Sequence, residues 1–575
     1  MIGRSTRRSF VQNGAVALSA MAAPIGIASE RPSQISSPLT VSFLDILRLP
    51  DSITAYRGFR GAVPENATPL AHSGEQWSNA GIVVESNVAG DALHLSLVAP
   101  SAPVALIRVC WKAAVRPDLL VLGDAWERSY GDLGWRNLIP ERVMPWYFAT
   151  FDQRACHAYG VKTDARALCF WQLDLEGVAL WLNVTNGGGG VELGKRRLAM
   201  ATVVAHRSAD DGNSVQAIKE LCRKMCARST RQIQPVYGAN DWCYSYGHST
   251  STSILRDTEL VVELSPPGAV RPFSVIDGGW EKATPAWPDM AKLASEIKRR
   301  SARPGIWIRP LEAPAATPPR LLLPDARFGD KKGRAQEHAY DPTVPEARTL
   351  IRSKVREVLA WGYEMVKHDF STYDLLGQWG FEMGPQPTLP GWSLFDRTRT
   401  NAEVIADLYA LIREEAGSNA VLDGCNTIGH LGQGIFDLQR TGDDTSGRQW
   451  ERTRRMGVNT LSFRLPQHGT FFIQDPDMVG LTDDVPWECN RQWLDLLARS
   501  GVATFVAPGP MAHGPEQRSA LREAFAIAAA GGLGAVPEDW METSVARHWR
   551  GESPNKTRWS YNWGGTGAEM PFLAS

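Results

Sequence analysis

After Pro235 the sequence alternates short apolar segments with helical patterns, and this alternation limits the possible folds more than any other feature. Parallel strands that are each followed by a helix produce such an order. Residues 235–530 suffice for one (β/α)8 barrel, which typically takes about 250 residues. A doubly wound open sheet is the alternative, but no glycine-rich dinucleotide fingerprint follows a first strand. We therefore predict an α/β fold with a (β/α)8 TIM barrel at 235–530.

Two helices of this region have clear end signals. Pro345 suits the first turn of one helix, and a strand is expected after it at 363–367. Thr400 and Glu403 form a capping box for a second helix, and Gly417 is a natural stop for it. Strand and helix patterns in this regular order support the barrel prediction.

Residues 38–232 have a different pattern, in which short alternating or β-branched segments are separated by Gly, Pro, Asn and Asp. Such spacing is typical of antiparallel sheets, so we predict an N-terminal β-sandwich domain here. The remaining residues 531–575 are too few for an independent domain. They are expected to form a short β-like extension, with a strand near 559–563.

The first 29 residues are typical of a targeting signal. Arg7 and Arg8 precede Phe10, and the uncharged segment 14–23 follows them. An arginine pair before a short apolar segment is the twin-arginine arrangement, which directs the export of a folded protein. The apolar segment is too short to span a bilayer, and no other segment approaches that length. We expect residues 1–29 to be a twin-arginine signal peptide and the protein to be periplasmic or secreted.

The charge balance argues against binding that is driven mainly by charge. The chain has 61 basic and 62 acidic side chains and a formal net charge of -1, so neither nucleic acid nor a membrane surface is an expected partner. Tryptophan is unusually frequent, with 21 residues against 18 Phe and 12 Tyr. Indole rings stack on the apolar faces of sugars, although core packing is an equal use for them.

Cysteine and histidine spacing gives little support for a metal. The 8 cysteines are spread along the chain, and only Cys222 and Cys226 are close in sequence. One such pair without a second pair is weak evidence for zinc. A metal-dependent barrel hydrolase would need ligands at several strand ends, whereas His368 and His468 are isolated. His368 is also the strand neighbour of Asp369 and should point the other way, so we predict no metal and no cofactor.

Acidic residues follow four of the predicted barrel strands. They are Asp277, Asp369, the pair Asp443 and Asp444, and the pair Asp475 and Asp477. The carboxyl ends of barrel strands meet at one face, where active sites lie. Two carboxylates at one mouth, with a Lys and an Arg nearby, are the groups of a glycosidase, in which one attacks and the other protonates the leaving oxygen. Each acid alone has a structural explanation as a cap or turn residue, but four in register favour a catalytic site.

These segments also resemble those of a known group of enzymes. The ordered motifs are Asp277-Gly-Gly-Trp280, Lys367-His-Asp369, Cys425, Arg440-Thr-Gly-Asp443-Asp444 and Gln474-Asp-Pro-Asp-Met478. As a set they resemble the motifs of the α-galactosidase clan, glycoside hydrolase families 27 and 36. A large antiparallel β-sandwich before the barrel is similar to family 36. Residues 122–131 also resemble a loop of the N-terminal domain of that family.

The resemblance implies a retaining glycoside hydrolase that forms a covalent intermediate on Asp369. It makes Asp443 the general acid and then the base, with the adjacent Asp444 as the other option for that role and otherwise a substrate-binding residue. Lys367 lies two residues before Asp369, so both side chains point to one face of a strand, where the ammonium keeps the carboxylate ionised. Arg440 resembles the arginine that holds a hydroxyl beside the reacting carbon.

Further residues are expected to contact the sugar. Asp277 and Cys425 resemble clan residues near the substrate, and Trp280 and Trp307 are candidates for pocket walls that stack on it. Trp242, on the expected first barrel strand, is a candidate of the same kind. Core packing is an equal alternative for each tryptophan, and a buried cysteine is often only a small apolar residue.

Gly278 is the one departure from the clan pattern, which usually has a second Asp at this position to hold the outer hydroxyls of galactose. The reaction class is therefore better supported than the sugar. The expected partner is an oligosaccharide or polysaccharide with a terminal α-galactoside, and β-L-arabinopyranose and α-N-acetylgalactosamine are alternatives. A non-catalytic carbohydrate-binding protein on this scaffold is the other alternative, although the presence of Asp369, Lys367 and Asp443 together argues against it.

Overall fold

The computed structural model describes residues 42–60, 63–209, 213–231, 233–282, 285–331, 337–509, 514–551 and 557–564. The predicted signal peptide at 1–29 lies outside this part of the chain. All of the described residues belong to one compact unit. Among them, no helix combines the length and the apolar character that crossing a bilayer requires.

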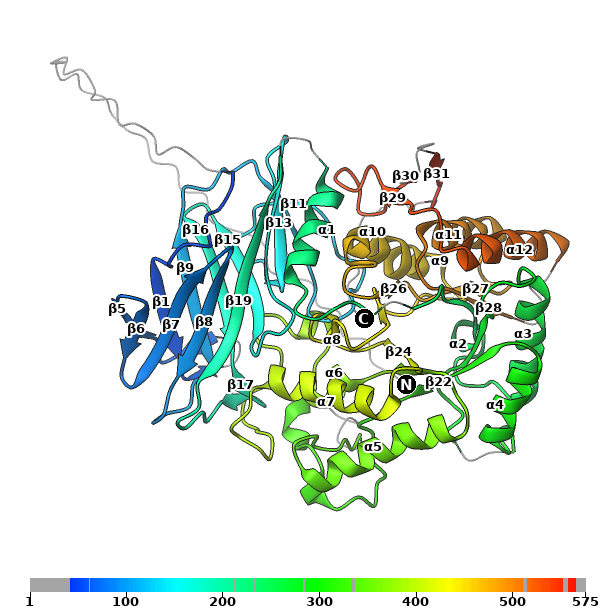
Figure 1. The fold of residues 1–575 in the computed structure, drawn as a ribbon, viewed down its shortest axis with the longest axis horizontal. Coiled ribbons are helices and arrows are strands. Elements are labelled where there is room, and N and C mark those ends of the chain that lie inside the picture. The colour runs from blue at the N-terminus through cyan, green and yellow to red at the C-terminus, as the bar shows by residue number, and fades with distance from the viewer. Residues whose placement is uncertain are drawn as a thin grey trace, which may run out of the picture. The chain divides into compact units, whose positions relative to one another are not determined.

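The N-terminal part contains two antiparallel sheets (Figure 1). The strand order in the smaller sheet is β12 (Met144–Pro145), β15 (Leu168–Asp174), β16 (Gly177–Asn183), β9 (Leu106–Lys112), β1 (Ser52–Tyr56) and β4 (Thr68–Pro69). The order in the larger sheet is β11 (Arg136–Asn137), β10 (Leu120–Gly123), β13 (Tyr147–Phe151), β14 (Cys156–Val161), β19 (Leu198–Arg207), β8 (Ala92–Val98), β7 (Ile82–Ala89), β6 (Gln76–Asn79) and β5 (Ala71–Ser73). Two separate hairpins are β2 (Gly58–Arg60) with β3 (Val63–Glu65), and β17 (Thr185–Asn186) with β18 (Gly189–Gly190).

Large apolar side chains pack the two sheets face to face. Phe148 of β13 and Trp171 of β15 come from different sheets, and their buried rings have centroids 5.4 Å apart. Helix α1 (Ser214–Met225) packs its apolar face on β14 and β19 of the larger sheet. Burial of the inward-facing residues of two sheets is the physical basis of a sandwich. The predicted antiparallel β-sandwich is confirmed.

A parallel sheet forms the barrel. Its order is β26 (Ile473–Asp475), β25 (Leu438–Arg440), β24 (Val421–Gly424), β23 (Met365–His368), β22 (Arg303–Ile308), β21 (Phe273–Ile276), β20 (Tyr237–Asn240), β28 (Thr504–Pro508) and β27 (Met478–Leu481). The strands β26 and β27 are two halves of one barrel strand that is broken at Pro476 and Asp477, where Asp477 has a φ of 70°. The chain itself thus closes the ring of eight strand positions, and the predicted (β/α)8 barrel is confirmed.

Helices follow the strands and cover the outside of the barrel (Figure 1). They are α2 (Trp242–Ser245), α3 (Ser251–Leu264), α4 (Met290–Arg299), α5 (Pro345–Ala360), α6 (Ser371–Leu376), α7 (Asn401–Ala416), α8 (Gly429–Gly432), α9 (Trp450–Thr453), α10 (Thr460–Arg464), α11 (Trp487–Ser500) and α12 (Pro515–Ala529). A π-helical segment, η5 (Arg454–Asn459), joins α9 to α10. Short 3-10 turns are η1 (Pro319–Leu321), η2 (Asp325–Phe328), η4 (Gly380–Glu382) and η6 (Leu465–Gln467).

The predicted ends of α5 and α7 are confirmed. Helix α5 begins at Pro345. At the start of α7, the Thr400 hydroxyl accepts a hydrogen bond from the Glu403 backbone N–H, and the Glu403 carboxylate accepts one from the Thr400 backbone N–H. The helix is followed by Gly417, whose φ of 69° lies in the left-handed region that glycine adopts without strain.

The first barrel strand is shorter than expected, so the prediction that Trp242 lies on it was wrong. Strand β20 ends at Asn240, whose side-chain oxygen accepts a hydrogen bond from the backbone N–H of Trp242 at 3.0 Å. This turn ends the strand, and Trp242 begins the short helix α2 instead. Its indole then lines the cavity at the barrel mouth.

Apolar side chains fill the barrel below the level of the acidic residues. The buried cluster consists of Val236, Cys243, Phe273, Val275, Met365, Val421, Leu438, Met478, Ala503, Phe505 and Ala507. These residues make the lower part of the barrel a packed core rather than a pore. Polar chemistry is therefore confined to the carboxyl ends of the strands.

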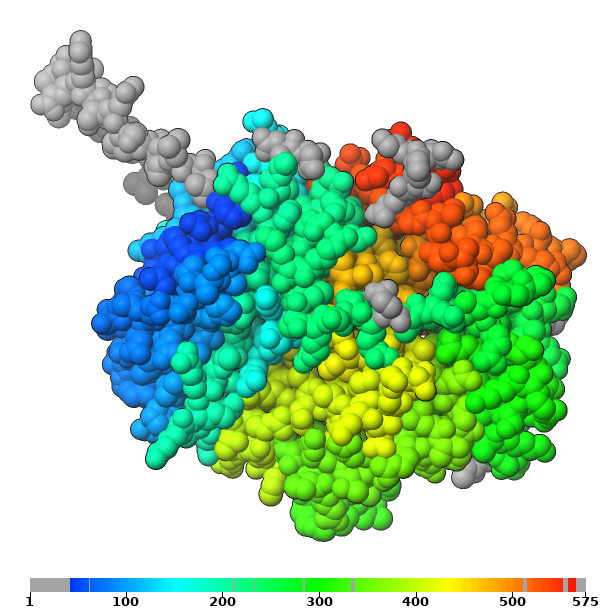
Figure 2. Space-filling view, in the orientation of Figure 1, coloured from blue at the N-terminus to red at the C-terminus, as the bar shows by residue number. Residues whose placement is uncertain are grey.

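Specific contacts fix the sandwich against the barrel. Arg196 pairs with Glu403 at the start of α7 at 2.7 Å, and the buried Asp124 pairs with Arg464 of α10 at 2.8 Å. The backbone of Ser129 pairs with the segment that follows β25. In Figure 2 the yellow atoms around α7 lie against the cyan and green atoms of the sandwich. The sandwich therefore reaches the barrel segment that carries two of the predicted catalytic acids.

The C-terminal extension forms a small antiparallel sheet. Its strands are β29 (Val536–Pro537), β30 (His548–Arg550) and β31 (Arg558–Ser560). The extension is tied to the barrel by Trp450 of α9, whose indole donates a hydrogen bond to the Trp563 carbonyl at 2.7 Å.

Candidate active site

A cavity of about 540 Å³ opens at the carboxyl ends of the barrel strands. Seven of the candidate residues from the sequence line it, namely Trp242, Asp277, Trp307, Lys367, Asp369, Asp443 and Asp444. They lie on, or shortly after, the strands β20, β21, β22, β23 and β25. The parallel arrangement brings these distant segments to one mouth, as expected for a barrel.

Three hydrogen bonds hold the Asp369 carboxylate in one orientation. Its Oδ1 accepts from the backbone N–H groups of Phe370 at 2.7 Å and Asn426 at 3.0 Å, and its Oδ2 accepts from the Trp307 indole at 2.9 Å. Burial would raise the pKa of this carboxyl, but nearby cations, with Arg128 the strongest, and the Trp307 hydrogen bond lower it below its usual value. An ionised and fixed carboxylate in a cavity is suited to attack an electrophilic carbon.

Lys367 forms a buried ion pair beside Asp369. Its Nζ lies 2.6 Å from Asp277 Oδ2, which also accepts a hydrogen bond from the Asn240 side chain at 2.9 Å. Burial alone would lower the pKa of Lys367, but Asp277 raises it well above its ordinary value, so the ammonium stays charged. Both Lys367 and Asp369 face the cavity, as the strand alternation predicted. His368, between them, packs on aromatic rings outside the strand layer.

Arginines occupy both carboxylate oxygens of Asp443. Oδ1 lies 2.9 Å from Arg128, and Oδ2 lies 2.6 Å from Arg452 of α9. The backbone N–H of Asp443 also donates to the Ser129 carbonyl at 2.9 Å. Its side chain is 17% exposed. Asp443 thus links the barrel to the sandwich and is fully engaged with cations.

Asp444 has a less symmetric environment. Its Oδ1 lies 3.2 Å from Arg440 and 3.7 Å from Arg128, whereas its Oδ2 accepts a hydrogen bond from the neutral indole N–H of Trp242 at 3.1 Å. Its side chain is 32% exposed. Burial would raise the pKa of Asp444, but Arg440 and Arg128 hold it far below its usual value. Among the described residues, Asp444 is the acid whose charge acts most strongly on Asp369.

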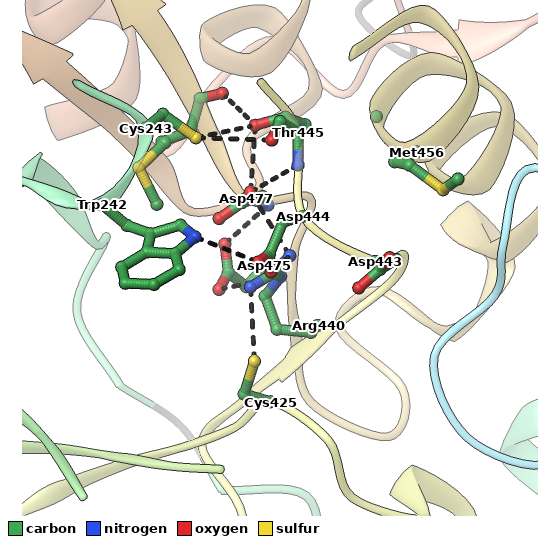
Figure 3. Close-up of polar contacts among 12 residues, drawn as sticks. Trp242, Cys243, Cys425, Arg440, Asp443, Asp444, Thr445, Met456, Asp475 and Asp477 are labelled. Carbon is green, nitrogen blue, oxygen red and sulfur yellow. Dashed lines mark hydrogen bonds and ion pairs between the residues drawn. The ribbon is translucent and has the colours of Figure 1, made fainter. Parts of the chain in front are cut away.

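Arg440 and Cys425 lie behind the cavity, so their contact with the substrate stays a prediction. They are 0% and 1% exposed and are not among the residues that line the cavity. Arg440 donates to Cys425 Sγ at 3.3 Å and lies 3.3 Å from Asp477 (Figure 3). Arg440 lies among the carboxylates of Asp444, Asp475 and Asp477, whose charge it balances. Figure 3 also shows Asp443 apart from this group, whereas Asp444 belongs to it.

Trp280 supports the cavity wall from behind, and its stacking on the substrate stays a prediction. Its half-buried indole donates a hydrogen bond to the Trp307 carbonyl at 2.9 Å. The ring meets Trp361 edge-on, with centroids 5.7 Å apart. The residues on either side of it, Gly279 and Glu281, line the cavity, whereas the Trp280 indole turns to the backbone of Trp307.

The aromatic wall consists of Trp242, Tyr246, Trp307, Phe370 and Trp379. Trp242 and Trp307 were candidates from the sequence, whereas the other three were missed. The available signal for Phe370 was its position directly after Asp369 in the sequence. In the structure its φ of 64° turns the chain at this point. Flat apolar rings around a set of charged groups suit the apolar faces and the hydroxyls of a sugar.

Arg128 of the sandwich is a further cavity residue that was not predicted. It lies in the loop after β10, pairs with Asp443 and lies over the Trp379 ring at 5.8 Å. Its charge is also the largest cationic effect on Asp369. The resemblance of residues 122–131 to a sandwich loop was the available signal, but no pattern in the sequence says that this loop reaches the barrel mouth.

Within the described ranges, no group of three or more His, Cys, Asp or Glu side chains is arranged to hold a metal ion. The acids of the cavity have side-chain cations as partners instead, as in the pairs of Asp277 with Lys367 and of Asp443 with Arg128 and Arg452. The charge of these carboxylates is thus balanced by the protein itself.

A comparison with models of protein families found no match, and a comparison with curated proteins found none either. Solved structures do match. TtGalA, an α-galactosidase from Thermus thermophilus in complex with p-nitrophenyl α-D-galactopyranoside, is 18% identical with a TM-score of 0.55, and the match covers 84% of this chain and 97% of that chain.

Two further structures match over a similar part of the chain. AgaA, a family 36 α-galactosidase from Geobacillus stearothermophilus, is 13% identical with a TM-score of 0.54, and the match covers 88% of this chain and 78% of that chain. The galactosidase domain of the α-galactosidase-sucrose kinase AgaSK is 15% identical with a TM-score of 0.53, and the match covers 88% of this chain and 76% of that chain. The chain therefore has the fold of the family 36 α-galactosidases, with the sandwich and the barrel that the sequence motifs predicted.

Proposed function

We propose that the protein is a metal-independent retaining glycoside hydrolase that cleaves terminal α-galactosides or a close stereochemical relative. One observation carries the proposal: a buried carboxylate, Asp369, is held ionised and fixed in a tryptophan-lined cavity that also contains a second carboxylate, Asp444. Two such carboxylates are what the two steps of retaining hydrolysis need. The fold shared with α-galactosidases supports the same reaction class.

In the first step, Asp369 attacks the anomeric carbon while the bond to the leaving oxygen breaks. The acid transfers its proton to that oxygen, so the aglycone leaves as a neutral alcohol. In the second step, a water molecule attacks the glycosyl-aspartate ester, and the same group, now a base, takes the proton of the water. Two displacements at one carbon restore its configuration. Lys367 and Arg128 stabilise the Asp369 carboxylate before the attack and after its release.

We assign the acid and base role to Asp444 in place of Asp443, which the motif resemblance favoured. Guanidinium groups occupy both oxygens of Asp443, so neither oxygen is open to the leaving oxygen of a substrate. In Asp444, Oδ2 accepts only a neutral N–H among the contacts described, so this oxygen can carry the proton. Arg440 and Arg128 hold the pKa of Asp444 far below its usual value in the free protein, so its role as an acid requires that the bound sugar raises this pKa. The sugar does so by displacing water from the exposed part of the side chain, because lost solvation disfavours the charged form of a carboxyl group.

We also propose that residues 1–29 export the folded protein to the periplasm or beyond the cell, as the arginine pair and the apolar segment indicate. There the enzyme would meet oligosaccharides or polysaccharides as substrates. The rival proposal is a binding protein without catalysis. The ionised and fixed state of Asp369 supports the enzyme, because binding alone does not need an activated nucleophile.

The first test is hydrolysis of nitrophenyl glycosides by the wild-type protein. We expect turnover of at least one among the α-galactoside, the α-N-acetylgalactosaminide and the β-L-arabinopyranoside, with the first-formed sugar keeping its anomeric configuration in proton NMR. An inverted product would contradict the retaining mechanism. No turnover, combined with protection of the protein by galactose against thermal unfolding, would favour the binding protein.

Gly278 is the position at which the sugar specificity can be tested. A Cβ on Gly278 would lie 3.7 Å from the Trp307 ring, which is an ordinary contact, and its φ needs no left-handed conformation. The space beside Gly278 therefore accepts a Cβ atom without strain. In the natural sequence an indole face, rather than a carboxylate, borders the sugar here.

Gly278→Asp should raise the preference for the α-galactoside over the β-L-arabinopyranoside. The new carboxylate can accept a hydrogen bond from the exocyclic hydroxyl, which only galactose has, and a hydrogen bond to a charged group contributes about 1.5–3 kcal/mol, or about 10- to 100-fold. The ratio of kcat/KM for the two nitrophenyl glycosides measures this change. Gly278→Ala is the matched control, since it adds bulk without an acceptor. Equal changes in both variants would show that volume, not hydrogen bonding, sets the preference.

A further inference from the structure

Glu127 is a buried carboxyl of the sandwich that is connected to Asp369 through one residue. It lies in the loop after β10 and is 1% exposed. Its Oε2 accepts a hydrogen bond from the side-chain amide of Asn426. The backbone N–H of Asn426 in turn donates to Asp369 Oδ1 at 3.0 Å. Asn426 therefore joins a sandwich side chain to the proposed nucleophile.

The other contacts of Glu127 fix its own position. Its Oε1 accepts hydrogen bonds from the Tyr130 hydroxyl at 2.5 Å and from the backbone N–H of Gly380 at 3.1 Å. The Tyr130 ring packs so closely on Gly380 that a Cβ there would come within 2.8 Å of it. All three partners of Glu127, including the Asn426 amide, are donors. A carboxylate satisfies such a set, because its two oxygens only accept.

Asn426 is held from a second side by helix α6. The backbone N–H of Tyr373 donates to Asn426 Oδ1 at 3.0 Å, and that of Thr372 donates to the Asn426 carbonyl at 3.1 Å. The side-chain amide is thus held at both ends, with its oxygen on α6 and its nitrogen on Glu127. This arrangement fixes where the backbone N–H of Asn426 points.

We propose that Glu127 is a positioning residue for Asp369: by holding the Asn426 amide, it keeps the Asn426 N–H on the nucleophile. The proposal rests on the proposed function, in which Asp369 attacks the sugar. The sandwich then has two tasks at the active site, because Arg128 lines the cavity while Glu127 orients a barrel residue from behind.

Charged groups from several elements act on Glu127. Its pKa is raised to about 7, because burial and, to a smaller extent, Asp443 raise it more than Arg128 and the hydrogen bonds from Tyr130 and Gly380 lower it. Arg464 of α10 also interacts with it electrostatically. Because the three donors need an ionised acceptor, the network is complete above neutral pH and weakens as the pH falls and Glu127 takes up a proton.

Glu127→Gln tests the proposal with a side chain of the same shape. A glutamine amide has one oxygen, which accepts, and one NH2 group, which donates. In either orientation this NH2 group faces another donor, which is the Asn426 amide or the Gly380 backbone N–H. We expect kcat to fall about 10- to 100-fold with KM changed less than about 3-fold, since misplaced catalytic groups slow the reaction more than they weaken binding. Asp124→Asn is the matched control. It breaks a buried ion pair of the same loop with Arg464 and should change kcat less than about 3-fold.

Asn426→Ala provides a second, independent variant. It keeps the backbone N–H and removes the amide that Glu127 holds, so it should lower kcat to the same extent. The double variant should be no worse than either single one, because both changes break the same connection. Losses that multiply in the double variant, or an equal loss in Asp124→Asn, would overturn the proposal.

A measurement without turnover separates this proposal from the proposed function. The Trp307 indole N–H donates to Asp369 Oδ2, so its NMR signal in protein labelled with ¹⁵N-tryptophan reports the ionisation of Asp369. The midpoint of its pH titration should move to higher pH in Glu127→Gln and Asn426→Ala, because the ionised form loses a hydrogen bond. An unchanged midpoint in both would overturn the positioning role. Absence of hydrolysis in the wild type would instead refute the enzyme.

Discussion

Replacing Asp369 with alanine should abolish hydrolysis of every glycoside that the wild-type protein cleaves. We expect kcat to fall by about 10⁴-fold or more, as it does when other hydrolases lose a catalytic nucleophile. Three hydrogen bonds orient the Asp369 carboxylate. The neighbouring acids are engaged elsewhere, Asp277 with Lys367 and Asp443 with two arginines, so they do not replace it.

Azide offers a direct check of this role. In Asp369→Ala the space of the carboxylate is open, and azide can attack the anomeric carbon of a nitrophenyl α-glycoside while nitrophenolate leaves. One displacement gives the β-glycosyl azide, whose configuration NMR can establish. Restored release of nitrophenolate together with this product would identify the lost group as the nucleophile.

Asp257→Asn is the matched control for loss of a buried aspartate. Asp257 is 2% exposed and accepts a hydrogen bond from Tyr244 at 2.6 Å, but it does not line the cavity. Its replacement should lower the unfolding temperature and leave kcat within about 3-fold. An Asp369→Ala protein that keeps more than about 1% of the wild-type kcat would contradict the assigned nucleophile.

The parts of the fold that depend on residues close together in the sequence could be predicted. Helix α5 begins at Pro345 and α7 at the Thr400 capping box, because such signals act within one helical turn. The barrel followed from the alternation of strands and helices. The fold then brought Asp277, Asp369 and the acids after β25 together, since parallel strands end at one face.

The depth of a side chain at the strand ends could not be predicted. Arg440 and Cys425 lie at the correct strands but behind the cavity, and Trp280 lies outside its wall. A shift of one residue along a strand or turn changes the direction of a side chain, and sequence patterns do not fix strand ends that closely. Trp242 shows the opposite case, because β20 ends early and the tryptophan still reaches the cavity.

Contacts between the sandwich and the barrel were the least predictable part of the site. Arg128 and Asp443 are more than three hundred positions apart in the sequence, yet they pair at 2.9 Å. Glu127 likewise reaches Asn426 across this interface. Such pairs depend on how two domains pack, which no local pattern records. The sequence therefore predicted that Asp369 and Lys367 lie together at the barrel mouth, but not the sandwich residues that surround them.

Asp444→Ala should lower hydrolysis to an extent that depends on the leaving group. A methyl glycoside needs a proton on its leaving oxygen, so we expect kcat/KM to fall about 10²- to 10⁴-fold, the usual contribution of general acid catalysis. The aglycone of a dinitrophenyl glycoside leaves as the stable dinitrophenolate anion without taking up a proton. With this substrate kcat/KM should therefore fall less than about 10-fold. With this substrate the glycosyl-enzyme should accumulate, because the base for its hydrolysis is absent. A burst of dinitrophenolate would show this accumulation.

Asp443→Ala is the matched variant that decides between the two adjacent acids. Its removal leaves Arg128 and Arg452 without their closest carboxylate, and these cations then act more strongly on Asp369 and Asp444. That change should lower kcat/KM for both substrates by a similar factor, because it does not remove the proton donor. If the leaving-group dependence instead appears in Asp443→Ala and is absent in Asp444→Ala, the acid is Asp443. The arginine pairs of Asp443 would then have to open when the sugar binds, so that its carboxyl group can reach the leaving oxygen.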